Sequence, residues 1–190
     1  MTLAYRYLFP AMWLSWVGYW WAASFNVKTT ARREPLHSRL SHIVPLTLAF
    51  VLLFPESSPI QVLGERFLPV AVWPFWVGAA LTLAGLLFTV WARVHLGRNW
   101  SGTVTVKQGH DLVTSGPYRL VRHPIYTGLL LALVGFALAR GEWRGVVAVA
   151  LAGGSFWRKL RIEERWMREQ FGAVYEEYSR RVSALIPFVL

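Results

Sequence analysis

The residues of this chain that can carry chemistry gather in two segments of its second half. The first, residues 112–128, reads LVTSGPYRLVRHPIYTG and holds two arginines, a histidine and two tyrosines. The second begins at Arg158 and sets the adjacent acids Glu163 and Glu164 among seven basic residues. At helical spacing both acids flank an apolar stripe, and they need partners there because burying an unpaired charge is costly. We therefore expect the two acids to meet basic or hydrogen-bonding partners elsewhere in the fold.

Taken one at a time, these residues have ordinary structural explanations. Arg122 and His123 fit the positively charged flank of a membrane segment, and Tyr126 fits the membrane interface. Glu163 and Glu164 fit surface ion pairs with basic residues about one helical turn away. No pair of histidines or acids has the spacing of a metal site, so we predict no bound metal.

Composition excludes several classes of protein. Of the 190 residues, 55% are hydrophobic and only 16% are charged. The absence of cysteine excludes disulfides, zinc–thiolate sites and cysteine nucleophiles. The net charge of +10 would suit a nucleic-acid binder. The basic residues flank apolar stretches, however, which is typical of a membrane protein, and we expect no nucleic-acid partner.

Five apolar stretches predict an all-α integral membrane protein. Two of them, residues 8–25 and 67–92, carry no charge and are long enough to span a bilayer, which takes roughly 20 residues. The three shorter stretches are residues 43–54, 125–139 and 145–157. We predict five transmembrane helices, a tight hairpin between the last two, a cytoplasmic loop and a C-terminal amphipathic helix.

The basic residues are distributed unevenly between the two sides of this predicted bundle. With the N-terminus outside, the inner segments hold sixteen Lys and Arg residues and the outer segments hold four. Inner loops of membrane proteins carry this excess, so we place both polar segments on the cytoplasmic side of an inner membrane. Residues 8–25 also have the length of a signal peptide, but their many tryptophans disfavour cleavage.

No internal repeat or linker is evident, and we expect one membrane domain. Within it, residues 1–92 read as scaffold helices and residues 93–190 as the cofactor-binding catalytic half. In the catalytic half, residues 102–107 (GTVTVK) predict a short extended piece. Gly116 and Pro117 predict a turn.

Two further features mark helix ends in the catalytic half. Pro124 fits the first turn of a helix, whose exposed amides near Arg122 and His123 would favour an anionic ligand. Residues 158–183 carry apolar side chains at helical spacing and predict an amphipathic helix. Gly172 is expected to kink or end that helix.

The polar segments occur in a specific order. His110 is followed by LVTSGPY, RHPIYTG, an apolar hairpin and RIEERWMREQFGAVYEEYSRRVSALIP. This order resembles the isoprenylcysteine carboxyl methyltransferase family and, within the same superfamily, the phosphatidylethanolamine N-methyltransferases. The resemblance covers residues 97–187. It implies an integral-membrane methyltransferase that uses S-adenosylmethionine and takes a lipid-like acceptor from the bilayer.

The resemblance also implies roles for individual residues. The adenosine side of the cofactor would be lined by His110, Leu112, Val113, Gly116 and Tyr118, and its ribose and methionine part by His123, Pro124 and Tyr126. Glu163 and Glu164 match paired acids that serve cofactor binding. Arg122 and Arg158 are candidates for holding an anionic acceptor, and Tyr126 is a candidate catalytic group beside them.

The acceptor stays open at this level, among oxygen, nitrogen and sulfur nucleophiles. A carboxylate, such as that of a prenylcysteine, needs a positive clamp. A phospholipid amine would need to lose a proton to a nearby acid or tyrosine. Membrane sterol reductases, which use NADPH, are an alternative with a similar C-terminal architecture, but Ile125 and Leu129 depart from their pattern.

A membrane scaffold or a transporter subunit is a further alternative, which the absence of ionisable groups from the apolar stretches disfavours. No glycine-rich string follows a strand, which disfavours the soluble methyltransferase fold. The expected partners are membrane lipids and the lipid-like substrate, and the oligomeric state stays open.

Overall fold

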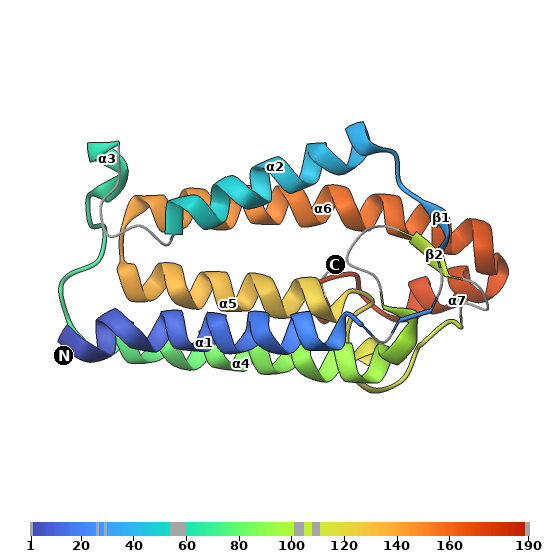
Figure 1. The fold of residues 1–190 in the computed structure, drawn as a ribbon, viewed down its shortest axis with the longest axis horizontal. Coiled ribbons are helices and arrows are strands. Elements are labelled where there is room, and N and C mark those ends of the chain that lie inside the picture. Colours follow the sequence, from blue (N-terminus) through green and yellow to red (C-terminus); the bar gives the residue numbers. More distant parts are fainter. Residues whose placement is uncertain are drawn as a thin grey trace.

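The computed structural model describes residues 2–25, 27–28, 30–53, 60–100, 105–107 and 111–188, and it is largely helical (Figure 1). The long helices are α1 (Thr2–Ala23), α2 (Leu36–Leu53), α4 (Val72–Leu96), α5 (Pro124–Arg140) and α6 (Trp143–Phe171). The shorter elements are β1 (Thr30–Arg33), α3 (Gln61–Gly64), η1 (Gly97–Asn99), β2 (Thr105–Lys107), η2 (Gly116–Arg119) and α7 (Ala173–Arg181). The strands β1 and β2 pair antiparallel, and β2 covers the last three residues of the predicted extended piece. The start of that piece lies outside the described residues.

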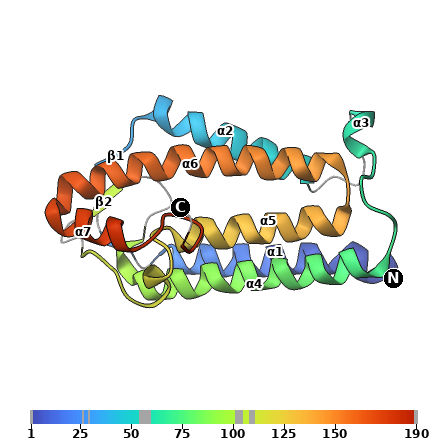
Figure 2. The ribbon, with the colours of Figure 1, turned by 180° about the vertical axis from the view of Figure 1, so that it is seen from behind.

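The five long helices run lengthwise in two layers, as Figure 1 and Figure 2 show from opposite sides. One layer holds α1, α4 and α5, and the other holds α2 and α6. The N-terminus, α3 and the α5–α6 turn lie at one end of the bundle. The small sheet and α7 lie at the other end, so the polar segments of the sequence gather there.

The apolar stretches of the sequence fall largely within these helices. By length and composition, two helices of the described chain can cross a membrane, namely α2 and the run Val72–Asn99 that contains α4; α5 is apolar but shorter. Large apolar side chains stay exposed on the outer faces, among them Leu14, Val44 and Leu87. Soluble proteins rarely expose so much apolar surface, so the structure indicates a membrane protein. The number of five spans stays a prediction.

Helices α4 and α5 pack backbone against backbone along a seam of four glycines. A Cβ atom added to Gly78 would lie 2.3 Å from the carbonyl oxygen of Gly135, and one added to Gly85 would lie 2.4 Å from that of Gly128. Such contacts leave no room for a side chain, which is how small residues let membrane helices approach closely. Between the two glycine pairs, the hydroxyl of Thr82 donates to the carbonyl of Ala132 at 3.1 Å, which bonds the two helices directly.

The turn between α5 and α6 confirms the predicted hairpin. Gly141 ends α5 in a left-handed conformation, with φ at 63°, which glycine adopts without the steric cost that a Cβ would bring. Its carbonyl accepts the amide of Phe67 at 2.9 Å, and the amide of Trp143 donates to the carbonyl of Glu65 at 3.1 Å. The segment before α4 therefore anchors the hairpin.

Helix α6 is longer than predicted. The last apolar stretch and the amphipathic tail form one continuous helix through Phe171, because no glycine or proline interrupts residues 155–171 and only the polarity changes along them. Gly172, with φ at 52°, then ends the helix, as expected, and α7 follows. The chain thereby turns back, and the end of α7 reaches the start of α5, where the Arg122 side chain bonds the Ser179 carbonyl.

Candidate active site

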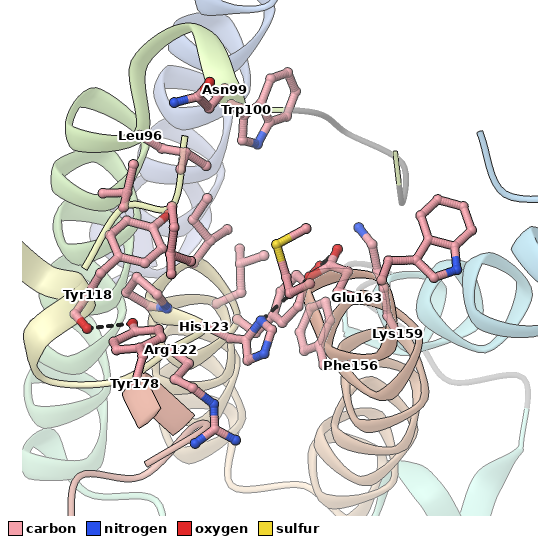
Figure 3. Close-up of a pocket in the computed structure, with 18 of the residues that line it drawn as sticks. Leu96, Asn99, Trp100, Tyr118, Arg122, His123, Phe156, Lys159, Glu163 and Tyr178 are labelled. Carbon is pink, nitrogen blue, oxygen red and sulfur yellow. Dashed lines mark hydrogen bonds and ion pairs between the residues drawn. The ribbon is translucent and has the colours of Figure 1, made fainter. Parts of the chain in front are cut away.

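A cavity of about 300 Å³ lies at the polar end of the bundle (Figure 3). Side chains of α1, α2, α6 and α7 line it, together with the end of α4 and residues between 111 and 129. Part of the lining is polar and aromatic, as at Glu163 and Tyr118, and part is apolar, as at Leu46 and Leu129. A cavity of this size and mixed character suits a small-molecule ligand.

The cavity brings together most of the residues predicted from the sequence. Those that line it are Leu112, Val113, Tyr118, Arg122, His123, Pro124, Tyr126 and Glu163. Gly116 and Glu164 lie close by without lining it, and Arg158 lies elsewhere. His110 falls outside the described residues.

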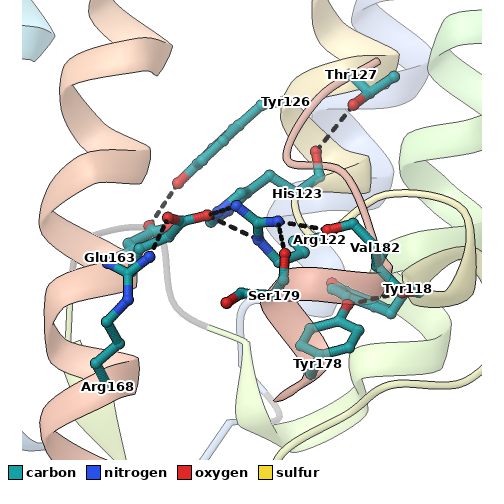
Figure 4. Close-up of polar contacts among 11 residues, drawn as sticks. Tyr118, Arg122, His123, Tyr126, Thr127, Glu163, Arg168, Tyr178, Ser179 and Val182 are labelled. Carbon is teal, nitrogen blue, oxygen red and sulfur yellow. Dashed lines mark hydrogen bonds and ion pairs between the residues drawn. The ribbon is translucent and has the colours of Figure 1, made fainter. Parts of the chain in front are cut away.

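Glu163 is held on the cavity wall by two side chains of the other polar segment (Figure 4). The hydroxyl of Tyr126 donates to its Oε1 at 2.5 Å, and Nδ1 of His123 lies 3.4 Å from its Oε2. The ring of Tyr126 stacks between those of His123 and Phe156, with centroid distances of 5.5 and 5.0 Å. Burial would raise the pKa of Glu163, but the hydrogen bond from His123 and the charge of Lys159 lower it overall. Glu163 is therefore a charged hydrogen-bond acceptor and a weak base.

Glu164, the next residue, is buried and pairs with Arg122. Nε and Nη2 of Arg122 donate to its Oε1 at 2.8 and 2.5 Å, and Arg168 donates to its Oε2 at 3.2 Å. Burial would raise the pKa of Glu164, but the hydrogen bonds from the neighbouring histidine and from Arg122 lower it to about 2. Nη1 of Arg122 donates to the backbone carbonyls of Ser179, at 3.0 Å, and Val182. Each guanidinium nitrogen thus already has a protein partner, and Arg122 ties α6 and α7 together.

His123 connects the two acids into one network. Its Nδ1 and Nε2 atoms each lie 3.4 Å from a carboxylate oxygen, the first on Glu163 and the second on Glu164. Burial works to lower the pKa of His123, but the hydrogen bonds and charges of the two acids outweigh burial and raise it. A charged imidazole is therefore favoured between the acids.

The backbone at the start of α5 is already bonded by the C-terminal segment of the chain. The amide of Arg122 donates to the carbonyl of Ser183 at 2.8 Å, and the amide of His123 donates to that of Ala184 at 3.0 Å. The prediction that amides at this helix start are exposed to an anionic ligand is therefore wrong for these two groups. No local pattern in the sequence indicates that residues 183–184 return to this point.

Arg158 does not face the cavity. Its Nε donates to the hydroxyl of Ser41 on α2, and its side chain borders a separate groove on α6. The next residue, Lys159, lines the cavity instead, because successive helical residues point about 100° apart. Arg158, which the sequence suggested as an active-site cation, therefore does not line this cavity, whereas Lys159 does.

Gly116 acts through the backbone. It adopts a φ of 58°, and a Cβ atom there would lie 2.7 Å from the ring of His95. The ring is itself fixed by a hydrogen bond of 2.8 Å between its Nε2 and the hydroxyl of Ser115. Glycine at this position therefore lets the chain turn against α4 and directs Tyr118 to the cavity.

Sequence reasoning missed several residues of the cavity wall. They include Asn99, Trp100, Lys159, Tyr175 and Tyr178. The two tyrosines belong to the Y-x-x-Y end of the motif, and the motif could have identified them as site residues. Their helical spacing alone indicates part of an apolar stripe. The hydroxyl of Tyr178 donates to the carbonyl of Tyr118 at 2.7 Å, and burial raises the pKa of Tyr178 to about 12.

Asn99 and Lys159 offer contacts that a ligand can use. Within the described part of the chain, no group donates to the buried Oδ1 of Asn99, and buried polar atoms without a partner are uncommon. The ammonium of Lys159 lies 5.2 Å from the ring centroid of Tyr126. The cavity thus presents a carboxylate and an ammonium group close together on α6, and an amide oxygen on a separate part of its wall (Figure 3).

Comparison with known proteins relates this geometry to a family. Residues 73–174, more than half of the chain, match the family model described as phospholipid methyltransferase. A probable protein-S-isoprenylcysteine O-methyltransferase of rice, Oryza sativa subsp. japonica, is 28% identical over 177 residues, covering 88% of this chain and 87% of that protein. Protein-S-isoprenylcysteine O-methyltransferase B of Arabidopsis thaliana is 30% identical over 115 residues, or 59% of this chain and 58% of that protein. The cobalt-zinc-cadmium resistance protein CzcN of Cupriavidus metallidurans is 33% identical over 114 residues, or 59% of this chain and 51% of that protein.

Proposed function

The chain belongs to the phospholipid methyltransferase family, and from this premise we propose that it methylates a lipid-like carboxylate, such as that of a prenylcysteine, in the membrane. S-adenosylmethionine is the proposed methyl donor. The isoprenylcysteine names of the rice and Arabidopsis relatives support the acceptor class. The metal-resistance name of the CzcN relative specifies no acceptor.

We place this enzyme in an inner membrane with five spans, the N-terminus outside and the active site facing the cytoplasm. The charge distribution supports this orientation, since sixteen basic residues lie on the proposed inner side and four on the outer side. The cavity lies at the end of the bundle that holds the basic C-terminal helices, away from the N-terminus, which agrees with this assignment.

One observation carries the proposal: the two halves of the family motif, about 40 residues apart in sequence, meet at one cavity. Glu163 from the second half is bonded to His123 and Tyr126 from the first. The cavity is lined both by this network and by apolar side chains of α1 and α2, including Trp16 and Leu46. A polar cofactor and an apolar acceptor chain can therefore share it.

The groups on the wall fit S-adenosylmethionine. The carboxylate of Glu163 can accept hydrogen bonds from an amino or hydroxyl group, and Oδ1 of Asn99 can accept one from an amino group. Tyr118 and Tyr178 provide aromatic surface. When bound, the cofactor supplies a methyl group on a positively charged sulfur, from which an acceptor atom displaces it. The residues of the chain hold the reactants in line and exclude water.

The geometry favours an acceptor that needs no deprotonation. Glu163 has a lowered pKa and already accepts hydrogen bonds, so it is a poor base for an amine. A carboxylate is a nucleophile at neutral pH and needs only a cation to position it. Arg122 is committed to Glu164 and Arg158 lies outside the cavity, so we assign that cation to Lys159. Neither a phospholipid amine nor a reductase reaction with NADPH has comparable support.

The test uses the purified protein in detergent with labelled S-adenosylmethionine. We expect saturable binding, and methyl transfer to a small farnesylcysteine analogue that carries a free carboxylate. The matched control is the same analogue as its methyl ester, in which the acceptor oxygen is blocked, and it should take up no label. Transfer to phosphatidylethanolamine but not to the farnesylcysteine would overturn the carboxylate assignment, and absence of donor binding would overturn the enzyme.

A further inference from the structure

A second groove lies on α6, outside the active site. It encloses about 660 Å³ and is bordered by Arg158, Arg161, Arg165, Arg168 and Trp157, with Ile162 and Glu169 beside them. All four arginines are solvent-exposed, and Glu169 is the one acid among the residues that border the groove. The groove therefore carries an excess of positive charge that the proposed methyl transfer does not use.

The spacing of the arginines places them on one side of the helix. Steps of three, four and three residues between positions 158, 161, 165 and 168 keep their side chains within about 80° of one another. They extend over about 15 Å of helix length. Four guanidinium groups thus form a row, and each can hold a phosphate group through two parallel hydrogen bonds.

The groove starts where α6 leaves its apolar part. Trp157 is the last residue of the apolar stretch 145–157 and is 40% exposed. Tryptophan at the end of an apolar helix segment is typical of the membrane interface. The guanidinium of Arg161 lies 4.9 Å from the Trp157 ring centroid, and this contact holds a positive charge at the level of Trp157 along the helix.

Helix α2 supplies an apolar surface next to the charged row. Arg158 bonds the hydroxyl of Ser41 on α2, which brings the two helices together beside the groove. One and two turns of α2 further along, Val44 and Leu48 are 58% and 48% exposed. A ligand with a negatively charged head and apolar chains would match both surfaces at once.

We propose that this groove binds the phosphate headgroup of an anionic phospholipid, whose acyl chains lie along the exposed face of α2. Arg161 and Arg165 hold the phosphate, and Trp157 marks the depth of the headgroup. The groove also reaches the active-site network through Arg168, which both borders it and donates to Glu164 at 3.2 Å. Bound lipid therefore lies one side chain away from the acid that fixes Arg122.

The experiment titrates the whole purified protein in a neutral detergent with short-chain phosphatidylglycerol, and measures binding by thermophoresis. Short-chain phosphatidylcholine is the zwitterionic comparison, and glycerol phosphate is the free-phosphate comparison. We expect phosphatidylglycerol to bind at least tenfold more tightly than either. The double variant Arg161→Gln/Arg165→Gln should lose at least tenfold in this affinity, since each arginine near an anionic headgroup contributes measurably.

The matched control is Arg98→Gln/Arg180→Gln, which removes the same charge from exposed positions outside the groove. It should bind phosphatidylglycerol like the parent. An equal loss in both double variants would mean attraction by net charge alone and would overturn the site. Equal binding of the two lipids, or glycerol phosphate binding as tightly as phosphatidylglycerol, would overturn the lipid headgroup as the ligand. Circular dichroism of each variant verifies that the helices are intact.

Discussion

The body of α5 and its N-terminal end are built on different physical principles. Along the body of the helix, Gly128 and Gly135 pack closely against α4, and the contacts are made mainly by backbone atoms. At its N-terminal end, Arg122 and His123 meet two carboxylates of α6 in a buried ionic network. The glycine seam contains no titratable side chain. The network at the start of α5 contains charged side chains, which an apolar helix contact such as the seam would not stabilise. The ionic network therefore lies at one end of α5, and packing against α4 positions the rest of the helix.

The same contrast recurs between the adjacent acids Glu163 and Glu164. The side chain of Glu164 is 7% exposed, and its oxygens lie against Arg122, Arg168 and His123. Glu163 lines the cavity and has a more accessible side chain, 24% exposed. We therefore assign Glu164 to holding the wall and Glu163 to contacting the cofactor, which separates two residues that looked equivalent in the sequence.

The largest effect is expected at the seam. The double variant Gly78→Ala/Gly85→Ala should lose about 4 kcal/mol of stability, because each new methyl group would lie within 2.4 Å of a carbonyl oxygen on α5. In a helix open to its surroundings, alanine would instead be favoured over glycine. Thermal unfolding in detergent measures the difference.

The matched control for the seam is Gly153→Ala/Gly154→Ala in α6. Within the described part of the chain, a Cβ atom at Gly154 would have no neighbour within 4 Å, and one at Gly153 would have a single contact at 4.0 Å. The control should unfold at or above the temperature of the parent. If both double variants are equally stable, α4 and α5 do not approach as closely as the seam requires.

The next effect should separate the two acids. Glu164→Gln should cost about 2 kcal/mol of stability, since it weakens charge-assisted hydrogen bonds from the partly buried Arg122. Glu163→Gln should cost less stability than Glu164→Gln, because no arginine pairs with Glu163 among the contacts described above, and should weaken S-adenosylmethionine binding at least tenfold, or about 1.4 kcal/mol. Unfolding curves and binding isotherms of both variants, recorded side by side, test the division. Parent-like donor binding by Glu163→Gln would remove Glu163 from the cofactor site.

A smaller effect is expected at Lys159, on the opposite side of the network from Arg122. Lys159→Gln should raise the KM for the farnesylcysteine acceptor about tenfold, because a charge-assisted contact is lost, and should leave donor affinity unchanged. The control is the neighbouring variant Arg158→Gln, whose side chain points out of the cavity. If Arg158→Gln raises the acceptor KM and Lys159→Gln does not, the acceptor lies on the other face of α6.

Much of this arrangement could be predicted from the sequence because it depends on local pattern. Apolar runs predicted the helices, Gly141 and Gly172 end two of them, and most of the predicted site residues line the cavity. The sequence could not tell which of the adjacent basic residues Arg158 and Lys159 faces the cavity, since the packing of α6 against the other helices decides it. The bonds from Arg122 and His123 to residues 183–184 also depend on a long-range return of the chain, which no local spacing encodes.

The smallest effect concerns pH and again belongs only to the polar end of α5. The pKa of His123 is raised above its ordinary value of 6.5, so its contribution to stability is complete below pH 6.5 and is lost as pH rises through the raised value. The pKa of Glu164 is lowered from 4.5 to about 2, so its contribution is complete above pH 4.5 and is lost as pH falls toward 2. Stability should therefore be highest between about pH 4.5 and 6.5.

On the alkaline side we expect the unfolding temperature to fall by a few degrees, given that about 1 kcal/mol moves it by about 2–4 °C for a chain of this size. His123→Gln should abolish that fall while Gly153→Ala/Gly154→Ala keeps it, and an alkaline fall that survives in His123→Gln would assign the titration to another group.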